Sequence, residues 1–133
     1  MRGVKVLDSW ALLAYFEKEP GCDQVTQFLK QAAEEEKDLL ISVINWGEVL
    51  YVIERKHGKE KRDAIDHLMT QMHLEIVDAD QELTREAAHL KVNAKLSYAD
   101  SFAAALAKIR KAILITGDKD FRGLENQIKI NWL

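Results

Sequence analysis

The stretch AILITGDKDF, residues Ala112 to Phe121, predicts the arrangement of the whole chain. Its apolar run Ile113–Ile115 is short and mostly β-branched, which favours a buried strand, and a Thr-Gly pair follows it. A strand without polar alternation is typical of a parallel sheet that helices cover on both faces. Asp118 and Asp120 come directly afterwards, at the carboxyl end of the strand, where the ligand sites of such sheets lie. The stretch therefore indicates either a cation site or a polar turn in which one Asp caps the residues that follow.

The composition indicates one globular domain over residues 1–133. The chain is long enough to bury a sizeable core, and 47% of it is hydrophobic and 31% charged. No apolar run approaches the roughly 20 residues of a membrane span, so we expect no membrane association and a cytoplasmic location. The lone Cys22 excludes an intramolecular disulfide and a cysteine-rich zinc site. A net charge of -3 gives no global attraction for nucleic acid, so a nucleic-acid substrate would need a local basic patch or metal ions.

Strand and helix patterns alternate along the chain. Short apolar runs predict strands at residues 4–8, 39–42, 74–77 and 113–115, and a last edge strand at 128–132. Apolar residues at every third or fourth place predict helices at residues 10–16, 22–37, 43–57, 60–72, 81–95 and 98–111. Ser9 is expected to cap the first helix and Ser97 the last. This alternation, without a Gly-rich or Ser-rich linker, predicts a three-layer αβα domain around a mostly parallel sheet.

Four acidic residues have no basic partner close by in the sequence. Asp8 and Asp118 each end a predicted parallel strand, so both should lie at the carboxyl edge of the sheet. Glu48 interrupts the apolar stripe of its helix, with no Lys or Arg three or four places away. Asp100 lies in the first turn of the last long helix. Because like charges repel, the convergence of these four acids would require a divalent cation.

Structural roles could also explain two of these acids individually. The Glu48 side chain could extend into solvent or reach Arg55, two turns along its helix. Asp100 stands three residues after Ser97, which is the spacing of a capping box. The two hypotheses predict different partners for these carboxylates: a cation in one case, and solvent, Arg55 or the start of a helix in the other.

The type of ligand indicates the metal and its chemistry. An all-carboxylate site completed by water suits Mg²⁺ or Mn²⁺, whereas zinc prefers imidazole or thiolate ligands. The four histidines show no two-His ligand pattern. Carboxylate-bound Mg²⁺ can lower the pKa of a bound water, deliver it in line to a phosphodiester and stabilise the departing oxygen. The set of acids therefore favours phosphodiester hydrolysis.

The ordered motifs resemble the PIN domain, specifically the VapC-type toxin ribonucleases. They are Asp8-Ser9, Glu48, the LSYADSF sequence around Asp100, and the TGDKDF sequence that begins at Thr116. The resemblance implies a Mg²⁺-dependent or Mn²⁺-dependent endoribonuclease that forms a homodimer and is held inactive by a cognate antitoxin protein. It assigns the catalytic and metal-binding roles to Asp8, Glu48, Asp100 and Asp118. It assigns supporting roles to Ser9, Asn45, Thr116 and Asp120.

Basic residues near the expected metal edge could contact RNA phosphates. Lys119 and Arg122 are the expected contacts, because they flank the acids that follow the strand at 113–115. A denser basic segment lies at residues 55–62, but a charge run at a helix break is usually a solvated surface. Trp10 is bulkier than the residue often found after the Asp-Ser pair of the family.

Two other classes of function fit part of the pattern. A Mg²⁺-dependent phosphoacceptor or phosphatase domain also carries an Asp after its first strand, but a haloacid-dehalogenase-like nucleophile needs a second Asp where Trp10 stands. A receiver domain needs an early pair of acids, which is missing. The other class is a non-catalytic binding module with the PIN fold. Metal-dependent cleavage of RNA would distinguish these classes. Neither a dinucleotide-binding nor a P-loop pattern is present.

Overall fold

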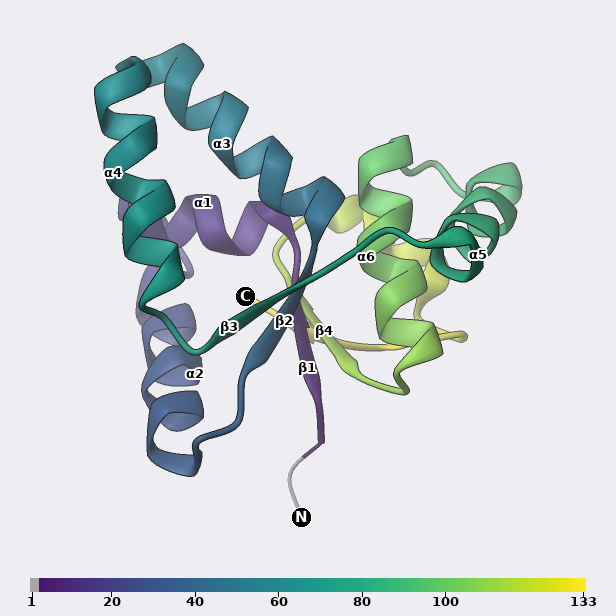
Figure 1. The fold of residues 1–133 in the computed structure, drawn as a ribbon. Helices are drawn as coiled ribbons and strands as arrows, with labels where there is room; N and C mark the ends of the chain where they lie inside the picture. The colour runs from purple at the N-terminus through teal and green to yellow at the C-terminus, as the bar shows by residue number, and fades with distance from the viewer. Residues whose placement is uncertain (1–2) are drawn as a thin grey trace.

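A parallel sheet of five strands lies at the centre of the described residues, 3–133 (Figure 1). The structure is a computed structural model. Every pair of neighbouring strands is parallel, and the strand order is β3-β2-β1-β4-β5. The strands are β1 (Lys5–Leu7), β2 (Leu39–Ser42), β3 (Leu74–Val77), β4 (Ile113–Thr116) and β5 (Lys129–Trp132). Because β1 lies between β2 and β4, the ends of these three strands meet at one edge.

Helices cover both faces of the sheet, which gives the predicted three layers. They are α1 (Ser9–Glu17), α2 (Cys22–Glu35), α3 (Val43–His57), α4 (Lys59–Thr70), α5 (Gln81–Asn93) and α6 (Tyr98–Ile109), with a short 3-10 helix η1 (Lys119–Leu124). In Figure 1, α1, α2 and α4 lie on one side of the sheet and α5 and α6 on the other.

Alternating strand side chains enter two separate apolar cores. Val6 and Leu114 belong to the core that α5, α6 and η1 cover. Their chain neighbours Leu7 and Ile115 belong to the core that α1 to α4 cover. Since successive side chains of a strand point to opposite faces, a strand buried on both faces is apolar at every position. This explains why β4 appears in the sequence as a continuous apolar run.

Helix α6 approaches the sheet closely because its side chains are small. Residues Ser101–Ala107 are all buried, and four of these seven are alanines. The helix runs back along the sheet into β4, so its first turn lies near the carboxyl ends of the strands. This places Asp100 beside the residues that follow β1 and β4.

The predicted elements are confirmed, with small differences at their ends. Helix α2 ends at Glu35, before the expected 37, and α5 ends at Asn93, before the expected 95. The prediction that Ser9 caps α1 was wrong, because Asp8 is the capping residue. The Asp8 backbone is extended, with φ -92° and ψ 177°, and its carboxylate accepts a hydrogen bond from the Ala11 amide at 2.8 Å.

No helix within residues 3–133 combines the length and the apolar composition that crossing a membrane requires.

Candidate functional site

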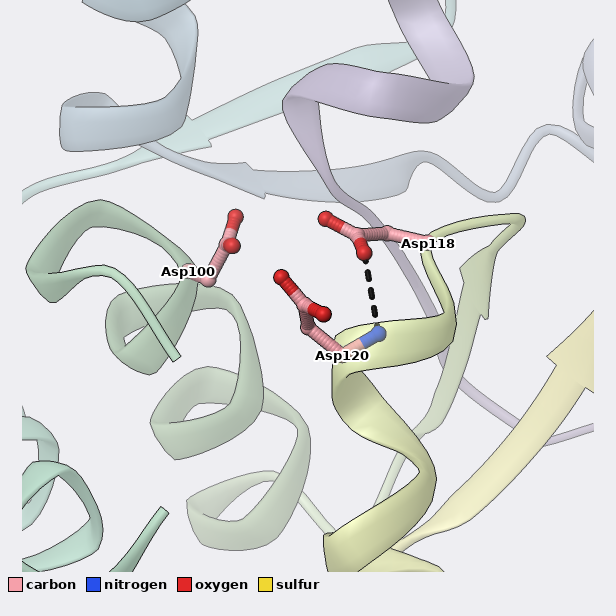
Figure 2. A group of neighbouring side chains, drawn as sticks. All are labelled: Asp100, Asp118 and Asp120. Carbon is pink, nitrogen blue, oxygen red and sulfur yellow. Dashed lines mark hydrogen bonds between the residues drawn. The ribbon is translucent and has the colours of Figure 1, made fainter. Parts of the chain in front are cut away.

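Three carboxylates converge beyond the end of β4. Asp100 comes from the first turn of α6, Asp118 from the turn after β4 and Asp120 from η1. One oxygen of each lies within 4.8 Å of the others, and Figure 2 shows the three side chains facing a common space. Asp100 and Asp118 are half-buried and Asp120 is exposed. Two of the four predicted metal ligands therefore lie in this group, and Asp120 joins them.

Asp8 lies beside this group, fully buried. One carboxylate oxygen accepts the Ala11 amide and the other accepts the Thr116 hydroxyl. The pKa of Asp8 is raised from 3.8 to about 7. Burial is the main cause, the hydrogen bonds from Thr116 and Ala11 oppose it, and the charges of Asp100 and Asp118 contribute to the rise. Asp8 thus interacts electrostatically with the group although both its oxygens are already occupied.

Glu48 is held at the same edge by a residue that follows β1. The Ser9 hydroxyl donates a hydrogen bond of 2.6 Å to a Glu48 carboxylate oxygen. Glu48 is half-buried, and Arg55 does not pair with it; the Arg55 guanidinium lies over the Tyr51 ring, 5.1 Å from its centroid. The Ser9 hydroxyl is free for this role because Asp8 caps the helix instead.

The environment of Asp100 disfavours its ionised form. The pKa of Asp100 is raised from 3.8 to about 6, mainly by burial and also by the negative charges of Asp118, Glu48 and Asp120, while the hydrogen bond with Ser97 lowers it. Ser97 caps α6 as predicted, by accepting the Asp100 amide at 3.1 Å. The cap uses the backbone of Asp100, and its carboxylate faces the other acids (Figure 2).

Two buried polar side chains hold the segments of the site together. Thr116 donates to Asp8 and accepts the Asp118 amide at 3.0 Å, so it joins the ends of β1 and β4. The Asn45 amide donates to the Ala99 carbonyl at 3.0 Å, and its oxygen accepts the Ser42 hydroxyl at 2.6 Å. Asn45 thereby ties the start of α3 to the residue before Asp100.

Trp10 and Gly117 form a contact that the sequence does not indicate. A Cβ atom at position 117 would overlap the six-membered ring of Trp10. Trp10 follows the Asp8-Ser9 pair and Gly117 precedes Asp118, so the contact braces the two acid-bearing turns against each other. The bulk of Trp10 is accommodated by the absence of a side chain at Gly117.

The predicted phosphate contacts lie next to the acids. Lys119 and Arg122 are exposed on η1, and together with Asp120 they line a pocket that extends towards α5. Lys95, which also lines this pocket, was not singled out from the sequence, because it lies more than 20 residues before η1 in the chain.

The ordered acids and their geometry agree with a sequence comparison. The family model of the PIN domain matches residues 5–126. The chain belongs to the PIN domain family. Among curated proteins, no sequence matches this PIN domain.

Solved structures share the fold of this PIN domain at low sequence identity. VapBC from Rickettsia felis, bound to a promoter DNA fragment, has a TM-score of 0.78 and 20% identity, covering 98% of this chain and 98% of that chain. DNA-bound VapBC from Salmonella typhimurium has a TM-score of 0.77 and 18% identity, again covering 98% of each chain. A VapC toxin from Mycobacterium tuberculosis that cleaves the sarcin-ricin loop has a TM-score of 0.72 and 14% identity, covering 90% and 93% of the two chains.

Proposed function

We propose that this PIN domain is a metal-dependent endoribonuclease and the toxin of a toxin–antitoxin pair. The convergence of the Asp100, Asp118 and Asp120 carboxylates, with Asp8 and Glu48 beside them, carries the proposal. Within residues 3–133, none of these five acids forms a salt bridge with a basic side chain. Such a concentration of negative charge is stabilised by a bound cation.

The donor set fits Mg²⁺ or Mn²⁺. All the donors are carboxylate oxygens, which hard divalent cations prefer, and no Cys or His of the described chain joins the group. Asp100, Asp118 and Asp120 would hold the ion, and Asp8 and Glu48 would add negative charge beside it. When bound, such an ion lowers the pKa of water and neutralises charge on phosphate oxygens.

Side chains around the acids orient them and the substrate. Thr116 fixes the Asp8 carboxylate, and Ser9 fixes that of Glu48. Asn45 fixes the turn that presents Asp100. Lys119 and Arg122 are placed to hold the RNA phosphates next to the scissile bond, because both are exposed and flank Asp120.

A cognate antitoxin protein is the proposed partner, and a homodimer the proposed assembly. Chains from the VapBC structures of two bacteria share this fold over 98% of their length, which supports an antitoxin partner. The sarcin-ricin loop cleaving activity of the Mycobacterium tuberculosis toxin supports RNA as the substrate class. We also propose that residues 1–133 act as a single domain.

The structure supports a phosphoacceptor role for Asp8 less well than it supports the nuclease function. A phosphoacceptor carboxylate must reach the phosphoryl group, whereas the Asp8 side chain is fully buried and both of its oxygens accept hydrogen bonds. A non-catalytic PIN module would have no need for five acids without basic partners.

Cleavage of RNA by the purified chain, freed of any bound partner, tests the proposal. We expect cleavage with Mg²⁺ or Mn²⁺, none with a chelator, and none from the Asp118→Asn variant with metal. Asn can cap η1 as Asp118 does, so this variant is expected to fold. Full activity in chelator, or no cleavage of any RNA after rigorous removal of the partner, would contradict the nuclease function.

A further inference from the structure

A pocket of about 520 Å³ lies between α5 and η1, next to the acidic group. Its volume falls within the roughly 300–1,000 Å³ of pockets that hold small ligands. Asp120 lines this pocket and is also one of the three converging carboxylates. A ligand in the pocket would therefore extend directly to the acids.

Three cationic side chains line the pocket. They are Lys95, from the segment after α5, and Lys119 and Arg122, from η1. All three are exposed, and none forms a salt bridge or hydrogen bond with another residue in the range 3–133. The protein as a whole is acidic, with a net charge of -3, so this is a local concentration of free positive charge. The ligand of this pocket should therefore be anionic. Phosphate is the expected anion, because an RNA strand would place one phosphate in the pocket and the next at the adjacent metal-binding site.

The remaining lining is suited to a nucleobase. Leu90 and Leu124 are buried and give the pocket an apolar floor. His89, Asn93 and Asn126 are exposed around it and supply hydrogen-bond donors and acceptors. Proteins read single-stranded RNA by stacking splayed bases and by bonding to their polar edges. A site for phosphate alone would not require this combination of an apolar floor and amide groups.

We propose that this pocket binds one unpaired nucleotide of the RNA, next to the phosphodiester that lies at the acidic group. Lys95, Lys119 and Arg122 hold its phosphate oxygens, and His89 and Asn93 contact its base. The proposal rests on the proposed nuclease function and adds the place where the enzyme selects its cleavage sequence. Phosphate contacts fix the register of the strand, and base contacts provide the selectivity.

Two variants separate the phosphate role from the base role. Lys95→Ala should weaken binding of all single-stranded oligoribonucleotides by about tenfold, which is the usual effect of losing one charged hydrogen bond. It should also lower the slope of log affinity against log salt concentration by about one. Asn93→Ala should leave that slope unchanged and broaden the base preference at a single position next to the cut.

Lys91→Ala is the matched control, because Lys91 is an exposed cation on α5, four residues before Lys95, and does not line the pocket. Binding is measured by fluorescence anisotropy with 12-nucleotide RNAs of varied sequence, in the Asp118→Asn background to prevent cleavage. Base preference is measured in proteins that keep Asp118 and can cleave. The RNA ends that the parent enzyme and the Asn93→Ala variant produce from a random RNA pool are sequenced and compared. Thermal melts confirm that each variant is folded.

The outcomes distinguish this proposal from the nuclease function itself. Metal-dependent cleavage together with Lys95→Ala and Asn93→Ala variants that behave like Lys91→Ala would overturn the pocket proposal and leave the nuclease function intact. If Lys95→Ala lowered the slope of log affinity against log salt concentration but Asn93→Ala left the base preference unchanged, the proposed contact between Asn93 and the base would be wrong. Absence of any RNA cleavage would overturn both proposals together.

Discussion

The indole of Trp10 lies directly over the α-carbon of Gly117 and leaves no room there for a side chain. The two residues are 107 positions apart, and each is adjacent to a turn that carries acids, after β1 for Trp10 and after β4 for Gly117. The contact therefore packs these two turns against each other.

Replacement of Gly117 by Ala should lower both stability and activity. The added methyl group would force the Trp10 ring or the turn to move, and overpacking of this kind costs about 1–3 kcal/mol. Urea unfolding and RNA cleavage measure the two effects. Gly47→Ala is the control, because a Cβ there meets no atom within 4 Å and should be neutral or slightly stabilising in a helix. A second change, Trp10→Leu, should recover part of the lost stability; equal effects of Gly117→Ala with Trp10 or Leu present would refute the steric explanation.

Removal of the Asp100 charge should raise stability when metal is absent. Burial and the charges of Asp118, Glu48 and Asp120 already disfavour the ionised form, so Asp100→Asn should melt higher than the parent in chelator at pH 8. Across a Mg²⁺ series the parent should gain stability with the logarithm of concentration, and the variant should gain little.

Ser97→Ala distinguishes this effect from loss of a helix cap. Ser97 caps α6, and its loss should cost about 0.5–2 kcal/mol both with and without Mg²⁺. If Asp100→Asn instead melted lower in chelator and kept the Mg²⁺ response of the parent, Asp100 would have a structural role only.

The stability of the metal-free protein should fall as the pH rises from about 4 to about 7. The folded protein keeps protons on Asp8 and Asp100, with pKa values of about 7 and about 6, whereas the unfolded chain releases them near 3.8. The stability that these protons provide is complete below the unfolded pKa and is lost as the pH passes the folded pKa.

Melting temperatures from pH 4 to pH 8 in chelator measure this loss. Other groups also titrate, so the informative quantity is the difference from Asp100→Asn, which should show a flatter profile. Saturating Mg²⁺ should reduce the fall in the parent, because a cation favours the ionised carboxylates. Identical profiles for parent and variant in chelator would mean that the Asp100 pKa is not raised.

Asp118→Asn should reduce RNA cleavage at least about tenfold more than Asp120→Asn, a difference of about 1.4 kcal/mol in the barrier. Asp118 is half-buried beside the end of β4 and adds to the pKa shifts of both Asp8 and Asp100, whereas Asp120 is exposed. Initial rates at saturating Mg²⁺ measure the effect, and circular dichroism checks the fold. Equal losses would indicate that the two carboxylates contribute equally.

The fold could be predicted because burial on both faces leaves a visible trace in the sequence. The run at Ile113–Ile115 is apolar throughout since neither face of β4 meets water, and the small residues of α6 reflect its close approach to the sheet. The parallel arrangement then placed Asp8 and Asp118 at one edge. The ends of α2 at Glu35 and of α5 at Asn93 were not predicted, because apolar periodicity does not show at which residue a helix stops.

Two kinds of detail in the site could not be predicted from the sequence. One is which of two neighbouring residues caps a helix, and the other is which segments far apart in the chain come into contact. Asp8 and Ser9 are both good capping residues, and burial of Asp8 against Thr116 selected it as the cap. The Trp10–Gly117 contact and the approach of Lys95 to η1 each join segments that are far apart in the chain. Such pairs could be found only once the strand order was known.

The Thr116 hydroxyl carries a single proton, which gives its hydrogen bonds a direction. The Asp118 amide donates to the Thr116 oxygen, and the Thr116 proton is donated in turn to Asp8. If Asp8 took up a proton on that oxygen, its carboxyl group would donate to Thr116 instead of accepting from it, while the Thr116 oxygen could still accept from the Asp118 amide. Protonation of an acid that no solvent touches thus sets the direction of one hydrogen bond and leaves intact the bond that holds the turn of Asp118.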